Sequence, residues 1–374
     1  MYNHTFVCTK CHKESIPNAN LVKCNTCNGP LEVKYKTNIS NIQLFNHLGN
    51  IPTLSPVSER SQYISLGEGI TPSITLPNIF SNLNIILKAK LEFLNPSGSF
   101  KDRGSAMMIS MLKEMGVKDI VEDSSGNAGG SISAYSARAN INAHIFVPET
   151  APKPKIDQII IYGATIHSIS GTRDQATLEA QKFAEEKGYI YASHNLNPYF
   201  IEGTKVTGYE IYNQFKNHMP DHIILPVGNG SLYIGIWKAF NELKNAGLVF
   251  KFPKLHAIQS ENVMPLVNSF IGTPWNTLDA KHTIAGGIAV SNPPRMSEIM
   301  NVLRDSNGTA IAIGEDEIVK SQIELSQKEG IYCEPTCAIA FAAIPKLISQ
   351  KVISSGEEIL IPVTGFGLKD TAPI

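Results

Sequence analysis

The chain has 374 residues, which is too long for one small core and predicts two or more packed units. A content of 43% hydrophobic and 17% charged residues excludes a disordered protein, and a formal net charge of -1 gives no long-range field for nucleic acid or an anionic membrane. No run of about 18 apolar residues occurs, and residues 1–10 lack a signal or transit pattern. We therefore expect a cytoplasmic protein with no nucleic acid or membrane partner.

Four of the six cysteines form two C-x2-C pairs near the amino terminus, Cys8 with Cys11 and Cys24 with Cys27. Two such pairs can hold one tetrahedral ion, so the spacing predicts a structural zinc site in a zinc-ribbon-like segment of residues 1–36. The segment is too short to bury a core by itself, and a metal would stabilise it. Cysteines retained without metal and a redox C-x-x-C pair remain alternatives.

Further along the chain, residues 31–35 are typical of a strand and residues 37–65 of a polar linker. From residue 84 onward, short apolar runs alternate with stretches of helical period, which is typical of β-α-β units around a parallel sheet. The predicted strands are residues 84–89, 120–123, 144–147, 165–170, 189–193, 223–227, 255–259, 310–313 and 358–363. Two predicted helices end at residues 115 and 139. Five others cover residues 156–162, 173–187, 201–215, 232–243 and 315–329. The fold class is therefore α/β, with sites at the carboxyl ends of strands.

A lysine at the start of the first of these helices is a candidate nucleophile. Lys101 lies between Phe100 and small residues, and burial there would favour its neutral amine, which can attack an aldehyde. An ordinary first-turn lysine paired with Asp102 is the alternative.

Three further segments follow predicted strands. Residues 124–130, Ser-Ser-Gly-Asn-Ala-Gly-Gly, offer amides and hydroxyls to a substrate carboxylate, and Asn127 could hydrogen-bond a phenolic oxygen. Residues 228–232, Gly-Asn-Gly-Ser-Leu, open a helix and suit a phosphate dianion, although they match neither G-x-G-x-x-G nor a P-loop. Thr364 could face a ring nitrogen. Taken singly, each segment could also be a structural turn or strand end.

Together these segments resemble the threonine synthase family, which consists of pyridoxal phosphate (PLP) enzymes of the tryptophan-synthase β-subunit fold. Residues 66–72, 197–198, 202–203, 334–335 and 364–370 fit the same order, as do the cysteine pairs. The resemblance covers nearly the whole chain. It implies PLP fold type II, with two parallel-sheet α/β domains and the cofactor in the cleft between them. Residues 37–104 and 195–374 would form the large domain, and residues 105–194 the smaller one.

The resemblance also implies a role for each site residue. Lys101 would hold PLP as a Schiff base and then act as the catalytic base, with Phe100 beside the cofactor. Asn127 would contact the ring oxygen and Thr364 the pyridine nitrogen. The cofactor phosphate would lie on Gly228, Asn229, Gly230, Ser231 and Leu232, and the substrate carboxylate on Ser124, Ser125 and Asn127. The implied reaction converts O-phospho-L-homoserine and water to L-threonine and phosphate, in a homodimer.

The departures from the family lie on the substrate side. Ala128 replaces a threonine, His194 an asparagine, and Ala289 an arginine that is common in the family. Phe200 replaces an arginine that helps to bind the substrate phosphate, and it has no donors for a dianion. Charges that could substitute for that arginine are Arg138, Lys153, Lys155 and Arg295. The alternatives are β-elimination or β-replacement on serine, threonine, O-phosphoserine or a specialised-metabolite precursor, and a binding protein that kept the fold.

Overall fold

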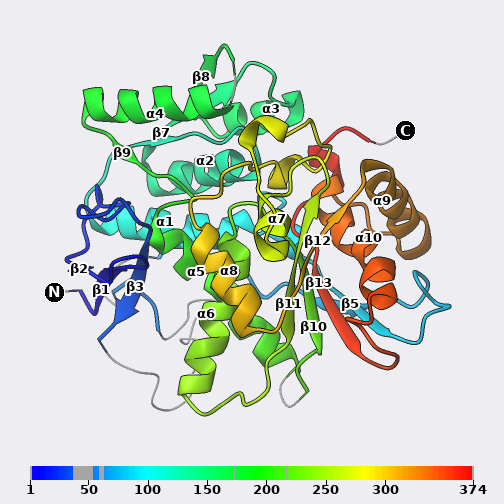
Figure 1. The fold of residues 1–374 in the computed structure, drawn as a ribbon. Coiled ribbons are helices and arrows are strands. Elements are labelled where there is room, and N and C mark those ends of the chain that lie inside the picture. Colours follow the sequence, from blue (N-terminus) through cyan, green and yellow to red (C-terminus); the bar gives the residue numbers. More distant parts are fainter. Residues whose placement is uncertain (1, 37–53, 59–62, 172, 216–217, 373–374) are drawn as a thin grey trace.

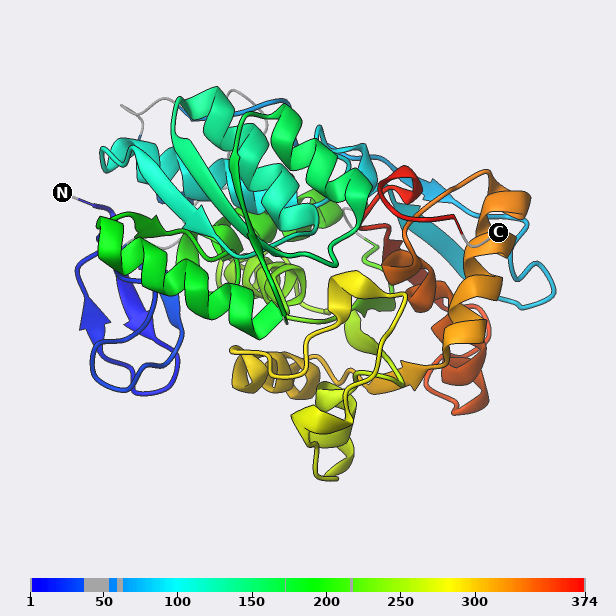
Figure 2. The same cartoon turned by 90° about the horizontal axis from the view of Figure 1, so that it is seen from above.

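The structure is a computed structural model that describes residues 2–36, 54–58, 63–171, 173–215 and 218–372. Its first element is a three-stranded antiparallel sheet at one end of the molecule (Figures 1 and 2), with the order β2-β1-β3. The strands are β1 (His4–Cys8), β2 (Glu14–Ser15) and β3 (Leu31–Tyr35), and β3 confirms the strand predicted there. Most of the predicted linker lies outside the described residues.

A six-stranded sheet with the order β12-β11-β10-β13-β5-β4 forms the larger part of the molecule. Its strands are short and largely apolar, and β13 is buried along its whole length, as expected for strands covered on both faces. The bounds are β4 (Ser73–Thr75), β5 (Ile86–Lys90), β10 (His222–Pro226), β11 (Lys254–Ser260), β12 (Ala310–Ile313) and β13 (Glu358–Pro362). All neighbours are parallel except β4, which pairs antiparallel with β5 at the edge. The sheet is therefore parallel with one exception at its edge.

Helices cover both faces of this sheet (Figure 1). On one side lie α5 (Pro198–Phe215), α6 (Ser231–Asn245) and α8 (Met296–Asp305), whose apolar residues share a core with β10 and β11. On the other side lie α9 (Glu315–Glu329) and α10 (Pro335–Ser349). The sequence did not predict α10, because nearly every side of it is buried and apolar, so it has no amphipathic period. The short helix α7 (Pro265–Ile271) packs near β11 and β12.

The smaller sheet is wholly parallel, with the order β8-β7-β6-β9. Alternate side chains of β6 and β7 serve two cores: Ile120 and Ile145 face the α1 and α2 side, and Val121 and Phe146 pack with alanines of α4. The strands are β6 (Asp119–Glu122), β7 (Asn142–Pro148), β8 (Thr165–Ile169) and β9 (Ile190–Tyr191). The helices are α1 (Lys101–Glu114), α2 (Asn127–Ala139), α3 (Lys153–Ile161) and α4 (Arg173–Lys187).

The two sheets give the α/β architecture that the sequence predicted. The division into domains at residues 104 and 194 stays a prediction. Among the described residues, none of the helices has the length and apolar character that a membrane span requires.

Candidate active site

Lys101 is the first residue of α1 and follows a tight turn that its neighbour holds in place. Asp102 accepts hydrogen bonds from the amide (2.6 Å) and hydroxyl (2.5 Å) of Ser97, and from the hydroxyl of Ser131 (2.6 Å). Asp102 thus ties the turn to α2. It makes no ion pair with Lys101 among the described residues, so the pairing considered from the sequence is wrong.

The amine of Lys101 lies in surroundings that favour its neutral form. Burial and, to a smaller extent, the positive charge of Arg173 lower the pKa of Lys101 to about 8. The amine nitrogen lies 4.9 Å from the ring centroid of Phe100 and 5.7 Å from that of Phe200. A partly neutral amine at physiological pH is what nucleophilic attack on an aldehyde requires.

Loops from both sheets converge on Lys101 and enclose one cavity. They follow β6, β10 and β13 at the carboxyl ends of these strands, where an α/β fold places its ligands. All the cofactor and substrate residues predicted from the sequence line this cavity: Phe100, Lys101, Ser124, Ser125, Asn127, Gly228, Asn229, Gly230, Ser231, Leu232 and Thr364. The structure therefore brings the four predicted segments together, while their individual roles stay predictions.

The loop between β10 and α6 forms a cradle of backbone amides. The first hydrogen bond of α6 runs from the amide of Ile234 to the carbonyl of Gly230 (2.8 Å), so the preceding amides of the first turn have no partner within the helix. Gly230 has a φ of +80°, and a Cβ there would lie 2.5 Å from Ile299. A Cβ on Gly228 would lie 3.0 Å from Ile288. Glycine is thus required for a backbone that can approach a phosphate closely.

Asn127 lies at the start of α2 in a network that the sequence did not reveal. Its side-chain nitrogen donates to Glu334 (2.7 Å), whereas its side-chain oxygen is buried with no hydrogen-bond partner among the described residues. Glu334 also pairs with Lys155 (3.0 Å), which in turn pairs with Asp370 (3.1 Å). An unpaired buried oxygen is costly, so it favours a bound group at this position.

Thr364 follows β13 and is buried with its hydroxyl 3.1 Å from the sulfur of Cys337. A hydroxyl can accept from the thiol and donate to an unprotonated ring nitrogen at the same time. The amide cradle, the unpaired oxygen of Asn127 and this hydroxyl together fit a phosphorylated pyridine cofactor whose ring hydroxyl can donate to Asn127, as in PLP.

A buried carboxyl–imidazole pair also borders the cavity. His194 lines the cavity, and its Nδ1 lies 2.6 Å from Glu122, while its backbone amide donates to the same carboxyl group (3.1 Å). Burial raises the pKa of Glu122 to about 8 and holds that of His194 well below its usual value. Both groups are therefore largely uncharged near neutral pH.

The four amino-terminal cysteines form a cluster, and all are free thiols. Their sulfur atoms lie within 4.8 Å of one another, with Cys8 and Cys27 separated by 3.5 Å and Cys11 and Cys24 by 3.6 Å. Tetrahedral coordination with Zn–S bonds of about 2.3 Å requires sulfur separations near these values. The cluster therefore fits the predicted four-thiolate zinc site.

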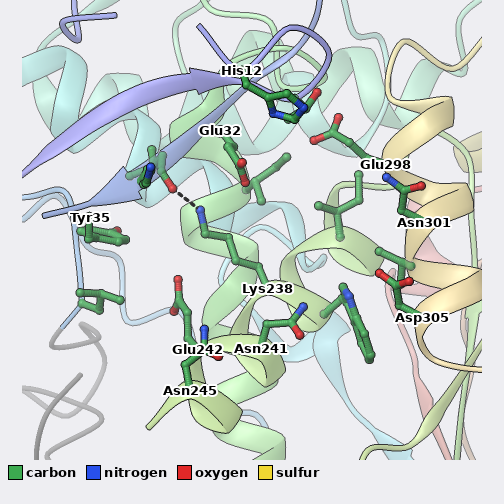
Figure 3. A pocket seen from close by; sticks show the side chains of 18 residues that line it. His12, Glu32, Tyr35, Lys238, Asn241, Glu242, Asn245, Glu298, Asn301 and Asp305 are labelled. Carbon is green, nitrogen blue, oxygen red and sulfur yellow. Dashed lines mark hydrogen bonds between the residues drawn. The ribbon is translucent and has the colours of Figure 1, made fainter. Parts of the chain in front are cut away.

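A second cavity, of about 550 Å³, lies between β3 and the helices α6 and α8 (Figure 3). Lys238 points into it, but its amine already donates to the carbonyl of Val33 (2.5 Å) and pairs with Glu202 (2.7 Å). Because the amine is bound by these partners, it is not available as a nucleophile. The candidate active site is the cavity at Lys101.

Comparisons with known proteins agree with this geometry. A family model described as "Pyridoxal-phosphate dependent enzyme" matches residues 64–365. The threonine synthase of Methanocaldococcus jannaschii is 34% identical over 375 residues, which cover 97% of this chain and 92% of that protein. A serine racemase from Dictyostelium discoideum has a TM-score of 0.66 at 26% identity, over 79% of this chain and 92% of that one. A fungal L-serine ammonia-lyase from Rhizomucor miehei has a TM-score of 0.70 at 19% identity, over 80% and 94%, and shows the fold alone.

Fold, cavity and family model define a PLP-dependent enzyme of fold type II. Within that class, the chain belongs to the threonine synthase family. The cofactor is PLP and the substrate an amino acid, as expected from the resemblance.

Two charged residues that line the cavity, Glu334 and Arg173, have no role in the predicted site. Glu334 had a signal in the sequence, since residues 334–335 belong to the motifs of the resemblance. Arg173 had none beyond its place at the start of a predicted helix. Ala289 lines a neighbouring hollow that Arg173 also borders.

Proposed function

We propose that the protein is a threonine synthase that converts O-phospho-L-homoserine and water to L-threonine and phosphate. The observation that carries the proposal is 34% identity to a threonine synthase across 97% of the chain, with Lys101 and the 124–130 loop at one cavity. The relative is matched over 92% of its own length, so the proposal concerns a whole enzyme of that kind.

The residues would divide into cofactor and substrate roles. PLP, when bound, supplies an electron sink for the charge that develops as the α-proton leaves. Lys101 would hold it, the amides of residues 228–232 would bind its phosphate, and Thr364 and Asn127 would meet its ring nitrogen and ring oxygen. A neutral hydroxyl opposite the nitrogen leaves the ring unprotonated.

The substrate carboxylate would lie at the start of α2. The first hydrogen bond of this helix joins the amide of Gly130 to the carbonyl of Gly126 (3.2 Å), so the preceding amides of its first turn are available to an anion. Ser124 and Ser125 add hydroxyls. A carboxylate held there would present its α-proton to the amine of Lys101, whose lowered pKa suits a general base.

The proposed reaction balances without another reactant. The α- and β-protons leave, the Cγ–O bond breaks with its electron pair on phosphate, and a proton returns to Cγ to form the methyl group. Water then adds its hydroxyl at Cβ, and a proton returns to Cα.

A panel of amino acids tests the proposal. PLP-loaded protein should release phosphate and form threonine from O-phospho-L-homoserine, and Lys101→Ala should do neither. The proposal fails if the wild-type protein leaves O-phospho-L-homoserine unchanged while it consumes serine, threonine or O-phospho-L-serine.

That second outcome would support β-elimination or β-replacement on another amino acid. The observation that favours this alternative is Phe200, which is fully buried where the resemblance expects the phosphate-binding arginine. Ala128 likewise lines the cavity without a hydroxyl.

A further inference from the structure

One basic residue of the cavity has no partner among the residues that the structure describes. Arg173 is the first residue of α4, is half-buried, and lines the cavity with Lys101, Ser125 and Asn127. Within the part of the chain that the structure describes, no hydrogen bond or ion pair engages its guanidinium group. A half-buried guanidinium group with five unused donors favours an anionic ligand.

The other candidate cations are engaged or remote from the cavity. Lys155 is bound to Glu334 and Asp370, both near 3 Å. Arg295 donates to the carbonyls of Asn195 (2.9 Å), Leu31 (3.0 Å) and Leu196 (3.0 Å), and pairs with Glu298 (2.9 Å). Lys153 and Arg138 are exposed. Of the four substitutes considered from the sequence, Lys155 lines the cavity but is engaged by two carboxylates, and the other three are not among the lining residues.

Phe200 cannot bind an anionic group of the substrate. Its ring packs so tightly on α1 that a Cβ on Gly104 would lie 2.4 Å from it, and it meets the imidazole of His194 edge-on at 5.8 Å. The ring supplies an apolar wall next to Lys101 and no donors. Any anion that the substrate brings must be bound by another side chain.

One acid near Arg173, Glu122, is largely uncharged near neutral pH. Burial raises the pKa of Glu122 to about 8 and also raises that of Asp123, whose carboxyl group accepts from the hydroxyl of Thr177. His194 is neutral because burial lowers its pKa. Glu122 therefore supplies little negative charge that would repel an anionic substrate.

We propose that Arg173 is the specificity residue that binds the anionic group at the end of the substrate side chain, which is the phosphate ester of O-phospho-L-homoserine. The inference rests on the proposed function for the identity of that anion. The carboxylate end of the substrate is assigned to Ser124, Ser125 and the first turn of α2, so the two anionic groups of one substrate have separate sites. A guanidinium group can bind a phosphate through two parallel hydrogen bonds.

Binding of a substrate analogue that cannot react tests the proposal without activity. The probe is the phosphonate in which a methylene replaces the ester oxygen of O-phospho-L-homoserine, and its neutral counterpart is L-norvaline. Calorimetry on PLP-loaded protein should show that Arg173→Ala weakens phosphonate binding about 10- to 100-fold, and Arg173→Lys less. L-norvaline binding should stay within about twofold. Arg138→Ala, an exposed arginine on α2, should match the wild type.

Equal affinity of wild type and Arg173→Ala for the phosphonate overturns the proposal, and so does an equal loss for both probes. If the wild type makes no threonine, the proposed function fails separately. Binding of O-phospho-L-serine and L-serine then decides. A preference for the phosphorylated amino acid that disappears in Arg173→Ala supports the role of Arg173, and absence of any preference in the wild type contradicts it.

Discussion

The chemistry of the Lys101 amine needs its neutral form, which water disfavours at physiological pH. The amine must be neutral to attack an aldehyde or remove a proton, yet an ordinary lysine is charged at physiological pH. Burial among Phe100, Phe200 and the loops resolves the conflict, because an ammonium ion loses hydration there. Arg173 acts in the same direction through its charge.

This pKa predicts how fast the cofactor-free protein captures PLP at different pH values. The rate at which the visible absorbance band of the bound cofactor appears should rise with pH, with a midpoint near 8, because only the neutral amine reacts. Arg173→Ala should move the midpoint upward, since it removes a charge that disfavours the ammonium form. A wild-type rate that still rises steeply near pH 10.5, the ordinary lysine value, would contradict the account.

At the scale of elements, the glycines between β10 and α6 determine how closely a phosphate can approach. Gly230→Ala should lower PLP affinity about tenfold or more, because its Cβ would lie 2.5 Å from Ile299 and displace the amide cradle. Gly247→Ala is the matched control, since Gly247 has a similar φ of +71° but no atom within 4 Å of the added Cβ. Both changes cost about 1 kcal/mol in backbone strain. Titration with PLP should show a loss of affinity in Gly230→Ala and none in Gly247→Ala. An equal loss of affinity in both variants would contradict the role of the amide cradle.

The amino-terminal sheet is a second element, and we expect its stability to depend on zinc. It contacts the body through His4, 3.1 Å from the hydroxyl of Tyr199, and through Tyr35, which donates to Glu202 (2.5 Å). If zinc holds the cysteine cluster, Cys24→Ser or chelation should destabilise the protein by roughly 4 kcal/mol. Elemental analysis measures the bound zinc, and thermal unfolding measures the stability. Restored zinc should reverse the effect of chelation. Full stability of metal-free protein would favour cysteines retained without metal.

The sequence predicted most strands and the cofactor loops because their signals are local. Glycine, serine and asparagine after an apolar run indicate a strand-to-helix turn whether or not the partner segments are known. The helix α10 gave no such signal, because it is apolar on nearly all sides. Strand β9 is shorter than predicted, Ile190–Tyr191 against residues 189–193. The approach of Arg173 to Lys101 depends on how α4 packs on β6 and β7, which local patterns do not contain.

At the scale of the whole molecule, a buried charge network joins the element that carries Lys101 to the large sheet. Arg103 on α1 pairs with Glu92 and with Glu210 of α5, each at 2.6 Å, and Glu210 pairs with Lys90 of β5 at 2.9 Å. All four side chains are buried. The network fixes the start of α1, and therefore Lys101, relative to the sheet.

Removing Arg103 should therefore affect the whole fold. Arg103→Met should cost roughly 3–5 kcal/mol of unfolding free energy, because two buried carboxylates lose their guanidinium partner and keep only Lys90. Arg304→Met, at an exposed arginine of α8, should change stability by about 0.5 kcal/mol or less. Denaturant unfolding of both variants provides the comparison, and similar stabilities would show that the network is dispensable. The homodimer and the cytoplasmic location stay predictions.

Oxygen-isotope tracing of the products in ¹⁸O-labelled water tests the proposed reaction most directly. If PLP-loaded protein breaks the Cγ–O bond of O-phospho-L-homoserine and adds water at Cβ, mass spectrometry will find one ¹⁸O atom in the hydroxyl of threonine and none in the released phosphate. Lys101→Ala should give neither product. Homoserine together with ¹⁸O-labelled phosphate, or a 2-oxo acid with ammonia in place of threonine, would contradict the account.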